Sequence, residues 1–298
     1  MPAQSPQILC IGSVLWDVIG RSASAMRLGS DVPGRITRLP GGVALNIAMA
    51  LARSGHAPAL LTAVGRDEAG ETLIAACQRL GLVTDYVYRS IDLPTDVYLA
   101  VEGANGLIAA IADAHSLEAA GPRILTALHN GALGSADTPY TGVIALDGNL
   151  TAALLADIAR DPCFARADLR IAPASPGKAE RLLPFLGGGP GTLYVNLEEA
   201  GLLCRASFAT ATEAASALVA RGARRALVTD GGKPTADATA GGVIEAAPPQ
   251  VLVTRVTGAG DTFMAAHISA ELRGRSRTEA LTDALQVAAA YVSGDTGL

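Results

Sequence analysis

The sequence predicts a three-layer α/β/α domain with a mainly parallel central sheet. Short apolar segments such as residues 7–12 (QILCIG) have the composition of strands that are buried on both faces of a parallel sheet. Segments with the apolar spacing of a helix, such as residues 44–54, alternate with them along the chain. Hydrophobic residues make up 50% of the chain and charged residues 17%, which provides for a large core. We find no repeat and no linker, so we expect one domain over residues 1–298.

The expected strands and helices follow one another in a regular order. Strands are predicted at residues 7–12, 59–64, 83–89, 141–146, 169–171, 191–196, 226–229 and 251–254. Helices are predicted at residues 44–54, 71–80, 116–130, 151–160, 178–185, 210–221, 263–272 and 278–293. Gly55 and Gly81 stand just after two of these helices, where glycine commonly ends a helix. Because strands and helices alternate, most of the strands are expected to run parallel.

A β-hairpin interrupts this alternation. Residues 95–102 and 107–112 have strand composition and are joined by residues 103–106 (GANG), whose Asn-Gly pair is a hairpin signal. Residues 20–40 are polar and contain several Gly and Pro residues, so we expect irregular structure or short edge strands there. The regions of about 14–39 and 92–114 are therefore predicted to form a small β-sheet that projects from the main domain.

Composition argues against several classes of protein. The formal net charge is −5 without a basic run, and aromatic residues make up 4%, so no nucleic-acid partner is expected. The four cysteines are scattered without a Cys-x-x-Cys pair, which is typical of buried thiols in a reducing compartment. No apolar run is long enough to span a bilayer, and the first residues lack the basic and apolar regions of a signal peptide. We expect a soluble, cytoplasmic protein without a membrane partner.

Residues 256–263 (VTGAGDTF) form the most informative stretch of the chain. They connect the predicted strand at 251–254 to a helical segment, which indicates a glycine turn that starts a helix. Glycine permits close approach of a ligand, and the free N–H groups and the dipole of the helix favour an anion. A carboxylate at this place repels a phosphate, so it is unexpected in a turn that only binds phosphate. Its presence is explained if Asp261 accepts a proton from a hydroxyl that attacks the phosphate, which is the role that we consider. The alternative is an ordinary turn in which Asp261 only stabilises the helix.

Polar side chains follow several of the predicted strands. They are Asp17, Asp147, Asn196, Thr229 and Asp261. Because parallel strands end at the same edge of a sheet, we expect these side chains to share that edge. Gly41 and Gly42 stand before the helix at 44–54 and permit close approach of a polar ligand. Asn46, in the first turn of that helix, can both donate hydrogen bonds to ligand hydroxyls and accept them.

Five short segments occur in an order and spacing that are highly specific. They are residues 41–48 (GGVALNIA), 64–70 (VGRDEAG), 196–200 (NLEEA), 228–231 (VTDG) and 257–263 (TGAGDTF). Together they resemble the ribokinase-like (PfkB) family of carbohydrate and nucleoside kinases. The sequence has neither a Gly-x4-Gly-Lys-Ser/Thr P-loop nor a complete Gly-x-Gly-x-x-Gly fingerprint. The resemblance runs from the first strand to the last helix and implies a ribokinase-like fold in which the small sheet is a lid that excludes water.

The resemblance implies catalytic roles for the glycine turn. Asp261 would be the general base for a primary hydroxyl. Gly258, Ala259 and Gly260 would shape the turn, and the N–H groups of Ala259, Gly260 and Asp261 would bind the charge on the transferring phosphoryl group. The phosphoryl donor would be ATP, with Mg²⁺ as cofactor.

The resemblance also implies binding residues around the turn. The nucleotide side would comprise Asn196, Thr229, Gly231, Thr257, Gly258 and Gly260. The substrate side would comprise Asp17, Gly41, Gly42 and Asn46, which would contact sugar hydroxyls. Glu199 and Asn196 would help to place Mg²⁺, partly through water. For Glu199 the alternative is an acid that only stabilises the start of a helix.

Within the family, three segments look most like pseudouridine kinases. They are residues 146–150 (LDGNL), 172–179 (APASPGKA) and 256–257 (VT). By this resemblance Asp96 or Asp113 would face the nucleobase, and the alternative for each is a solvent-facing acid. The implied reaction is phosphorylation of the 5′-hydroxyl of a nucleoside, first of all pseudouridine. Ribose, another nucleoside or a sugar acid remain alternative substrates, and a non-catalytic sugar or nucleoside sensor is an alternative of another class. An NAD-dependent oxidoreductase is disfavoured because its phosphate fingerprint is missing.

Two positions depart from the family pattern. Ala172 stands where the pseudouridine branch has an aspartate, and Arg255 stands where the family often has an aspartate, three residues before Gly258. Arg255 either contacts a phosphate or faces solvent, and it argues against a monovalent-cation site that uses that aspartate. An exposed edge of the small sheet would favour pairing with a second copy, so a homodimer through the lid is predicted.

Overall fold

The computed structural model describes residues 6–27 and 29–294. Its central sheet is formed by β1 (Ile8–Ile11), β4 (Ala59–Leu61), β9 (Val143–Asp147), β10 (Asp168–Ala172), β11 (Thr192–Asn196), β12 (Arg225–Asp230), β13 (Lys233–Thr239) and β14 (Gly242–Ala246). The strand order is β14-β13-β12-β11-β10-β9-β1-β4. Neighbouring strands in the series β4, β1, β9, β10, β11 and β12 run parallel to one another. Strands β13 and β14 continue the sheet in antiparallel pairs. The predicted mainly parallel sheet is confirmed.

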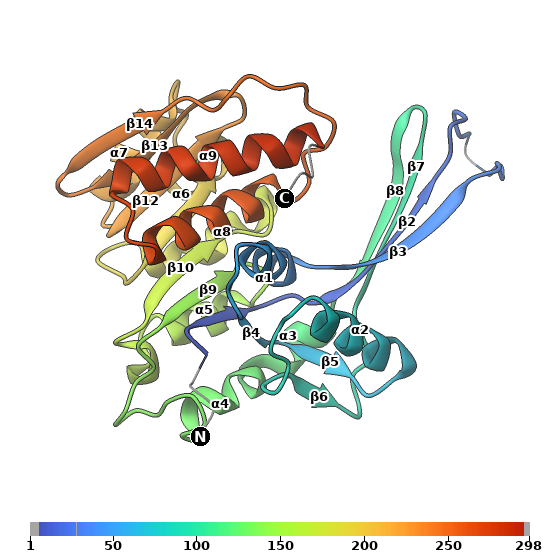
Figure 1. Ribbon diagram of the computed structural model, residues 1–298, viewed down its shortest axis with the longest axis horizontal. Helices are drawn as coiled ribbons and strands as arrows, with labels where there is room; N and C mark the ends of the chain where they lie inside the picture. The colour runs from blue at the N-terminus through green and yellow to red at the C-terminus, as the bar shows by residue number, and fades with distance from the viewer. Residues whose placement is uncertain (1–5, 28, 295–298) are drawn as a thin grey trace.

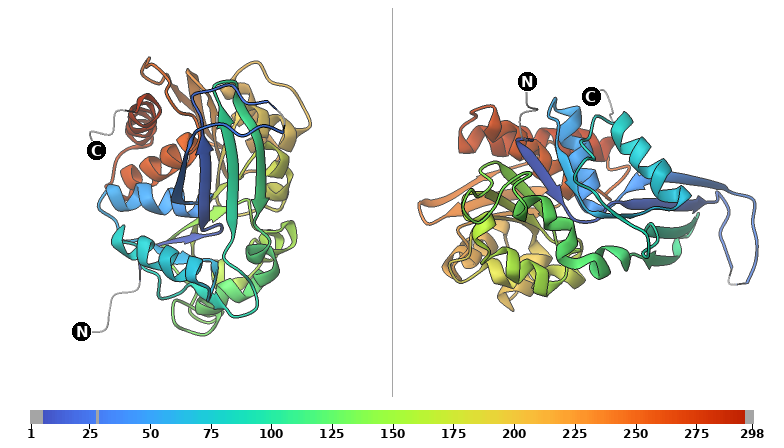
Figure 2. Two further views of the ribbon diagram at one scale, coloured as in Figure 1. Left: turned by 90° about the vertical axis from the view of Figure 1, so that its right-hand side faces the viewer. Right: turned by 90° about the horizontal axis from the view of Figure 1, so that it is seen from below.

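Helices cover both faces of this sheet, as Figure 1 and the right-hand view of Figure 2 show. One face carries α1 (Val43–Arg53), α2 (Glu68–Arg79), α8 (Ala259–Leu272) and α9 (Arg277–Ser293). The other carries α3 (Ser116–Ala120), η1 (Gly121–Leu125), α4 (Thr126–His129), α5 (Ala152–Ile158), η2 (Pro162–Phe164), η3 (Pro176–Phe185), α6 (Leu197–Cys204) and α7 (Ala211–Ala220). Within the described ranges, no helix is long and apolar enough to cross a membrane.

Strand β1 shows how the sheet serves both layers of helices. Leu9 and Ile11 belong to the core beneath α3 to α7, whereas Ile8 and Cys10 belong to the core beneath α1, α2, α8 and α9. Successive side chains of a strand point to opposite faces, so an apolar strand fills both cores at once. The predicted three-layer α/β/α fold is confirmed.

A separate small sheet projects from this body, toward the upper right in Figure 1. It is formed by β2 (Leu15–Arg21), β3 (Arg35–Gly41), β7 (Val97–Gly103) and β8 (Gly106–Asp113), in the order β3-β2-β7-β8. The hairpin that the Asn-Gly pair predicts is present as the antiparallel pair of β7 and β8. Two short strands, β5 (Ala63–Gly65) and β6 (Tyr88–Ser90), form a third sheet.

The predicted strand at residues 251–254 is wrong. This segment has no regular structure, and the side chains of Leu252 and Val253 are 82% and 57% exposed. β-branched residues favour a strand only where a neighbouring strand offers hydrogen bonds. Here the N–H groups of Thr254 and Arg255 donate instead to the carbonyl of Val292 near the end of α9.

Two other predicted elements are shorter than expected. The helix predicted at residues 116–130 is divided into α3, η1 and α4 because Gly121 and Pro122 interrupt it. The strand predicted at residues 83–89 contracts to β6, and Val83 contributes one isolated bridge to the central sheet. In both cases local composition indicated the right type of element but not its length.

Helix α8 is buried along most of its length and is tied to the sheet at its end. All residues from Thr262 to Ala270 are buried. Glu271 accepts hydrogen bonds from Arg170 of β10 at 2.5 Å and from Arg225 of β12 at 2.6 Å. Largely buried charges are stable only when they are paired in this way. The C-terminal end of α8 is therefore fixed against the sheet.

Candidate functional site

Helix α8 begins at a turn that leaves two amide groups without an acceptor. Gly258 precedes the helix with φ of 83°, a conformation that favours glycine. The N–H of Ala259 already donates to the carbonyl of Val256 at 3.0 Å. Within residues 6–27 and 29–294, the N–H groups of Gly260 and Asp261 have no acceptor, as is usual for the first turn of a helix. The capacity to bind an anion at this turn therefore lies with Gly260 and Asp261, not with Ala259.

The Asp261 side chain is half-buried at the start of α8. Its Oδ2 accepts a hydrogen bond from Nδ2 of Asn46, on α1, at 2.9 Å. Burial, together with the charges of Asp147 and Glu199, raises the pKa of Asp261 to about 7, against the opposing effect of the Asn46 hydrogen bond. A carboxyl group with this pKa can accept and release a proton near neutral pH.

Asp147 holds the start of α1 through a serine. Asp147 is fully buried at the end of β9, and its Oδ2 accepts the N–H of Ser13 at 2.8 Å and the Ser13 hydroxyl at 2.5 Å. The Ser13 hydroxyl oxygen accepts in turn the N–H of Val43, the first residue of α1, at 2.9 Å. These bonds fix α1, and with it Asn46, at the carboxyl edge of the sheet. The sequence analysis missed Ser13, whose place directly after the first strand was the available signal.

The small sheet approaches α1 at two glycines. A Cβ at Gly41 would lie 1.9 Å from Oδ2 of Asp17, and a Cβ at Gly42 would lie 2.4 Å from the carbonyl of Ser13. Asp17 lies in β2 directly opposite Tyr98 of β7, so both side chains are on one face of the small sheet. Burial raises the pKa of Asp17. The predicted residues Asp17, Gly41 and Gly42 are thus brought together, and Tyr98, which the sequence analysis did not single out, joins them.

The two acids that were expected to face a nucleobase are placed elsewhere. Asp96 is buried, and its oxygens accept hydrogen bonds of 3.0 and 3.2 Å from the first two N–H groups of α3. Asp113 lies opposite Val97, and consecutive residues of β7 point to opposite faces, so Asp113 is on the face away from Asp17. The geometry supports a structural role for Asp96 and gives Asp113 no place beside Asp17.

Asn196 and Glu199 bind each other at the start of α6, a helix that the sequence analysis did not predict. The N–H of Glu199 donates to Oδ1 of Asn196, and the N–H of Asn196 donates to Oε2 of Glu199, both at 2.8 Å. This reciprocal capping box gives both residues a structural task. Burial raises the pKa of Glu199, whose charge also acts on Asp261. Mg²⁺ prefers carboxylate oxygens as ligands, and Glu199 offers such oxygens near Asp261, although its Oε2 already accepts the N–H of Asn196.

A cavity of about 320 Å³ opens beside the glycine turn. Its apolar walls include Val251, Val253, Val256, Phe263, Leu285 and Ala289. Its polar groups include those of Thr229, Gly231, Thr235 and Gly260. The Thr235 hydroxyl is buried and has no hydrogen-bond partner among the described residues. An apolar cavity with a few polar groups is typical of a small-molecule site.

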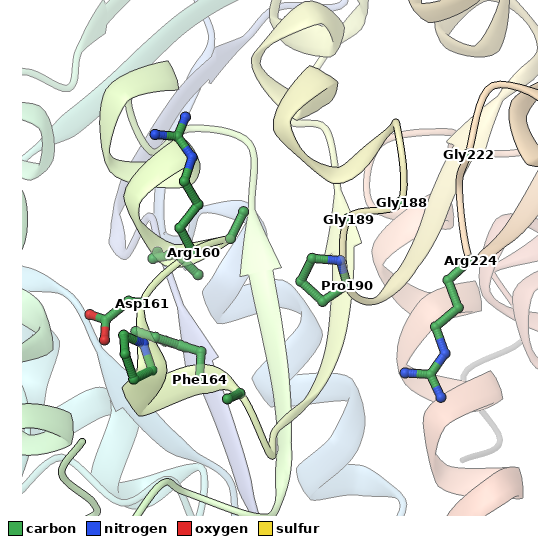
Figure 3. Close-up of a pocket in the computed structure, with 12 residues that line it drawn as sticks. Arg160, Asp161, Phe164, Gly188, Gly189, Pro190, Gly222 and Arg224 are labelled. Atoms are coloured by element: carbon green, nitrogen blue, oxygen red, sulfur yellow. The ribbon is translucent and has the colours of Figure 1, made fainter. Parts of the chain in front are cut away.

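A second cavity, of about 420 Å³, lies at the opposite edge of the central sheet, where β10, β11 and β12 begin (Figure 3). Asp161 lines this cavity, and its Oδ2 pairs with Nε2 of His129 at 2.7 Å. Together with Cys163 they form a cluster with metal-ligand chemistry. The other ring nitrogen of His129 bonds a backbone carbonyl, and the Asp161 carboxylate also accepts the N–H of Cys163. We therefore assign this cluster a structural role, remote from the glycine turn.

The fold is that of ribokinase-like proteins. The model of the pfkB family of carbohydrate kinases matches residues 5–295, and the chain belongs to this family. Members of this family are phosphotransferases with alcohol groups as acceptors.

Solved structures confirm the fold. A carbohydrate kinase from Agrobacterium tumefaciens superposes with a TM-score of 0.81 at 24% identity, covering 97% of this chain and 93% of its own. The ribokinase of Arabidopsis thaliana, solved with ribose and ATP, gives a TM-score of 0.78 at 22% identity with the same coverage of both chains.

Curated relatives match over shorter stretches. The uncharacterized sugar kinase YeiI of Escherichia coli K12 is 33% identical over 147 residues, which are 49% of this chain and 39% of that protein. The pseudouridine kinase of the same organism is 38% identical over 78 residues, which are 26% of this chain and 25% of that protein. The alignments thus span well under half of both relatives.

The raised pKa of Asp261 predicts a gain in stability from Asp261→Asn. Ionisation of Asp261 costs folding free energy as the pH rises from about 4 to about 7, so stability is lost over this range. We expect the variant to exceed the wild type by up to about 3 kcal/mol in unfolding free energy at pH 8, with a difference that shrinks toward pH 4. Urea denaturation at both pH values measures this. The same substitution at exposed Asp157 is the control and should give no such difference; a less stable Asp261→Asn variant at pH 8 contradicts the prediction.

Proposed function

We propose that the protein transfers the γ-phosphoryl group of ATP to the 5′-hydroxyl of a nucleoside, first of all pseudouridine. The observation that carries this proposal is the Asp261 carboxyl group, with a pKa of about 7, beside two free amide groups at the start of α8. A proton acceptor next to an anion site is useful for phosphoryl transfer from a nucleotide to an alcohol. It has no evident use in a protein that only binds a sugar or nucleoside.

In the proposed reaction, the glycine turn acts on the acceptor hydroxyl and on the transferred phosphoryl group. Asp261 accepts the proton of the acceptor hydroxyl while the hydroxyl oxygen attacks the γ-phosphorus, and the bond to the leaving ADP breaks. The N–H groups of Gly260 and Asp261 donate to the oxygens of the transferring phosphoryl group, where negative charge is concentrated. The positive end of the α8 dipole acts in the same direction.

The acceptor would lie between the small sheet and α1. Asp17 would accept hydrogen bonds from its sugar hydroxyls, and Asn46, which already contacts Asp261, would place the reacting hydroxyl. Gly41 and Gly42 would let Asp17 and the Ser13 carbonyl pack closely beside the bound sugar. Tyr98, on the same face as Asp17, would offer its ring to a nucleobase, since bases stack on aromatic side chains. The small sheet would close over the acceptor as a lid and keep water from the phosphoryl group.

The nucleotide would lie on the other side of the turn. We assign its base to the 320 Å³ cavity, with Thr229 and Gly231 at the polar positions. The phosphates would follow the turn from Thr257 through Gly258. Glu199, with Asn196 behind it, would hold Mg²⁺ through water, and this ion supplies neutralising charge for the phosphates.

Pseudouridine is preferred among the acceptors for two reasons. One is the 38% identity over 78 residues with a protein named pseudouridine kinase. The other is the set of three sequence segments that resemble that branch of the family. Ribose, another nucleoside and a sugar acid remain the alternatives, and Ala172 marks a departure from the branch.

The proposed general base can be tested by substitution and by pH. Asp261→Asn should lower kcat by about 10²–10⁴-fold because the reaction loses its proton acceptor. For the wild type, kcat/KM should fall about tenfold per pH unit below about 7, where Asp261 is protonated, and level off above it. Steady-state kinetics over pH 5.5–9, with Asp157→Asn as control, measure both effects. Unchanged turnover of Asp261→Asn would remove Asp261 from the mechanism.

The acceptor is identified by consumption of ATP with Mg²⁺ in the presence of pseudouridine, uridine, adenosine, ribose or 2-keto-3-deoxygluconate. We expect the highest kcat/KM for pseudouridine. In the variant Tyr98→Ala, KM should rise for nucleosides but not for ribose, because only nucleosides carry a base that can stack. Preference for another compound would keep the kinase and refute pseudouridine, and no turnover with any acceptor would refute the proposed function.

We also propose that two copies of the chain pair through the outer face of the small sheet. Ile36, Leu99 and Ile111 lie on the face away from Asp17 and are 76%, 39% and 63% exposed. Such a group of apolar side chains beside an open sheet edge favours an intermolecular contact. Sedimentation at micromolar concentration should show a dimer that Ile111→Asp converts to a monomer, whereas Leu202→Asp, at an exposed position of α6, should leave the dimer intact. A monomeric wild type contradicts this proposal.

A further inference from the structure

The approach to the glycine turn is held by the end of α9. The segment before the turn has no regular structure, and its backbone N–H groups at Thr254 and Arg255 donate to the carbonyl of Val292 at 2.8 and 3.2 Å. The hydroxyl of Thr254 donates to the same carbonyl at 3.1 Å. The position of this segment thus depends on the last turn of α9.

A single arginine joins the segment to that helix end. The guanidinium of Arg255 lies 3.8 Å above the ring of Tyr291, and its Nε donates to the backbone carbonyl of Tyr291 at 2.7 Å. The C-terminal carbonyl groups of a helix carry the negative end of its dipole, and an aromatic face also attracts a cation. The charge of Arg255 therefore interacts with both the backbone carbonyl and the aromatic ring of Tyr291.

Tyr291 passes this constraint on to the turn. Its hydroxyl donates to the carbonyl of Thr257 at 2.9 Å. A Cβ at Gly258 would lie 2.7 Å from the same hydroxyl oxygen. The tyrosine ring thus packs directly on the turn, and its place sets that of the peptide group between Thr257 and Gly258. The free amide groups of Gly260 and Asp261 follow within three residues.

We propose that Arg255 is a positioning residue, a cation built into the chain that orients the amide groups of the glycine turn through Tyr291. The inference rests on the proposed function, because it assigns those amides to the transferring phosphoryl group. Arg255 itself is exposed, and its side-chain contacts that we describe are with Tyr291, not with Asp261 or Asn46. Through the amide groups that it orients, Arg255 affects the stabilisation of the charge that develops in the transition state. Substrate binding depends less on Arg255.

The expected result is a fall in kcat with little change in KM. Arg255→Ala and Tyr291→Phe should each lower kcat about tenfold, since one oxyanion donor is worth about 10²–10³-fold and a displaced donor loses part of that effect. KM for the acceptor should stay within about twofold, since the turn acts mainly in the transition state. The double variant should be no slower than the slower single variant, because both substitutions break the same chain of contacts.

Two further measurements separate positioning from general loss of structure. Arg255→Lys keeps the charge without the planar group and should retain an intermediate kcat. Added guanidinium ion should restore part of the kcat of Arg255→Ala, whereas tetramethylammonium at equal ionic strength, which cannot donate hydrogen bonds, should not. The matched control is Arg123→Ala. Arg123 also lies over a tyrosine ring, that of Tyr88 at 4.9 Å, and donates to helix carbonyls, but it is remote from the turn.

The amide resonances of Gly258 and Gly260 give a readout that does not require turnover. Their chemical shifts should change in Arg255→Ala and Tyr291→Phe and stay unchanged in Arg123→Ala. Wild-type kcat in both turn variants, or unchanged amide shifts, would overturn this inference and leave the proposed kinase intact. Absence of turnover in the wild type with every acceptor would overturn the proposed function, and the amide shifts would still decide whether Arg255 orients the turn.

Discussion

The site depends on keeping one carboxyl group, that of Asp261, in a place where its ionisation is unfavourable. Burial and the charges of Asp147 and Glu199 oppose ionisation, and among the described residues only Asn46 donates a side-chain hydrogen bond to this carboxyl group. A charged group in such a place moves toward water unless its backbone is fixed. Helix α8 meets this demand because its middle is buried and Glu271 ties its end to the sheet.

The two sides of the site are held by different parts of the fold. The proposed acceptor side is fixed by Ser13, whose hydroxyl joins the end of β9 to the first residue of α1. The proposed nucleotide side is bounded by the irregular segment 251–254 and by α9, which contribute side chains to the cavity. The glycine turn stands between them and receives contacts from both. A small shift of α1 or of the segment 251–254 with α9 is therefore expected to move the same few backbone amide groups of the turn.

The sequence was sufficient for features that depend on neighbouring residues. The glycine turn, the paired glycines before α1 and the Asn-Gly hairpin were predicted because each is a local signal. Contacts between distant positions could not be predicted, because they depend on how the whole chain folds. Ser13 donates to Asp147, 134 residues further along the chain, and Tyr291 donates to Thr257, 34 residues before it.

Pairing and register explain the errors. The strand predicted at 251–254 failed because no neighbouring strand was there to pair with it, which composition does not reveal. Asp113 was considered for the acceptor side, but the register of β7 with β8 puts it on the other face of the small sheet. Asp96 instead binds the start of α3, a short helix within a region that had been predicted as one long helix.

The topology of the small sheet also has a consequence for how the chain folds. Its two inner strands, β2 and β7, pair residues that are 81 positions apart in the chain, with two helices and the strands β3, β4, β5 and β6 in between. Closing so long a loop costs entropy before any contact repays it, and high contact order slows folding. During synthesis β2 can pair with β3 as soon as both have left the ribosome, but its other edge stays open until β7 follows. The small sheet that would cover the acceptor is therefore complete only after β8, which ends at Asp113, has been made.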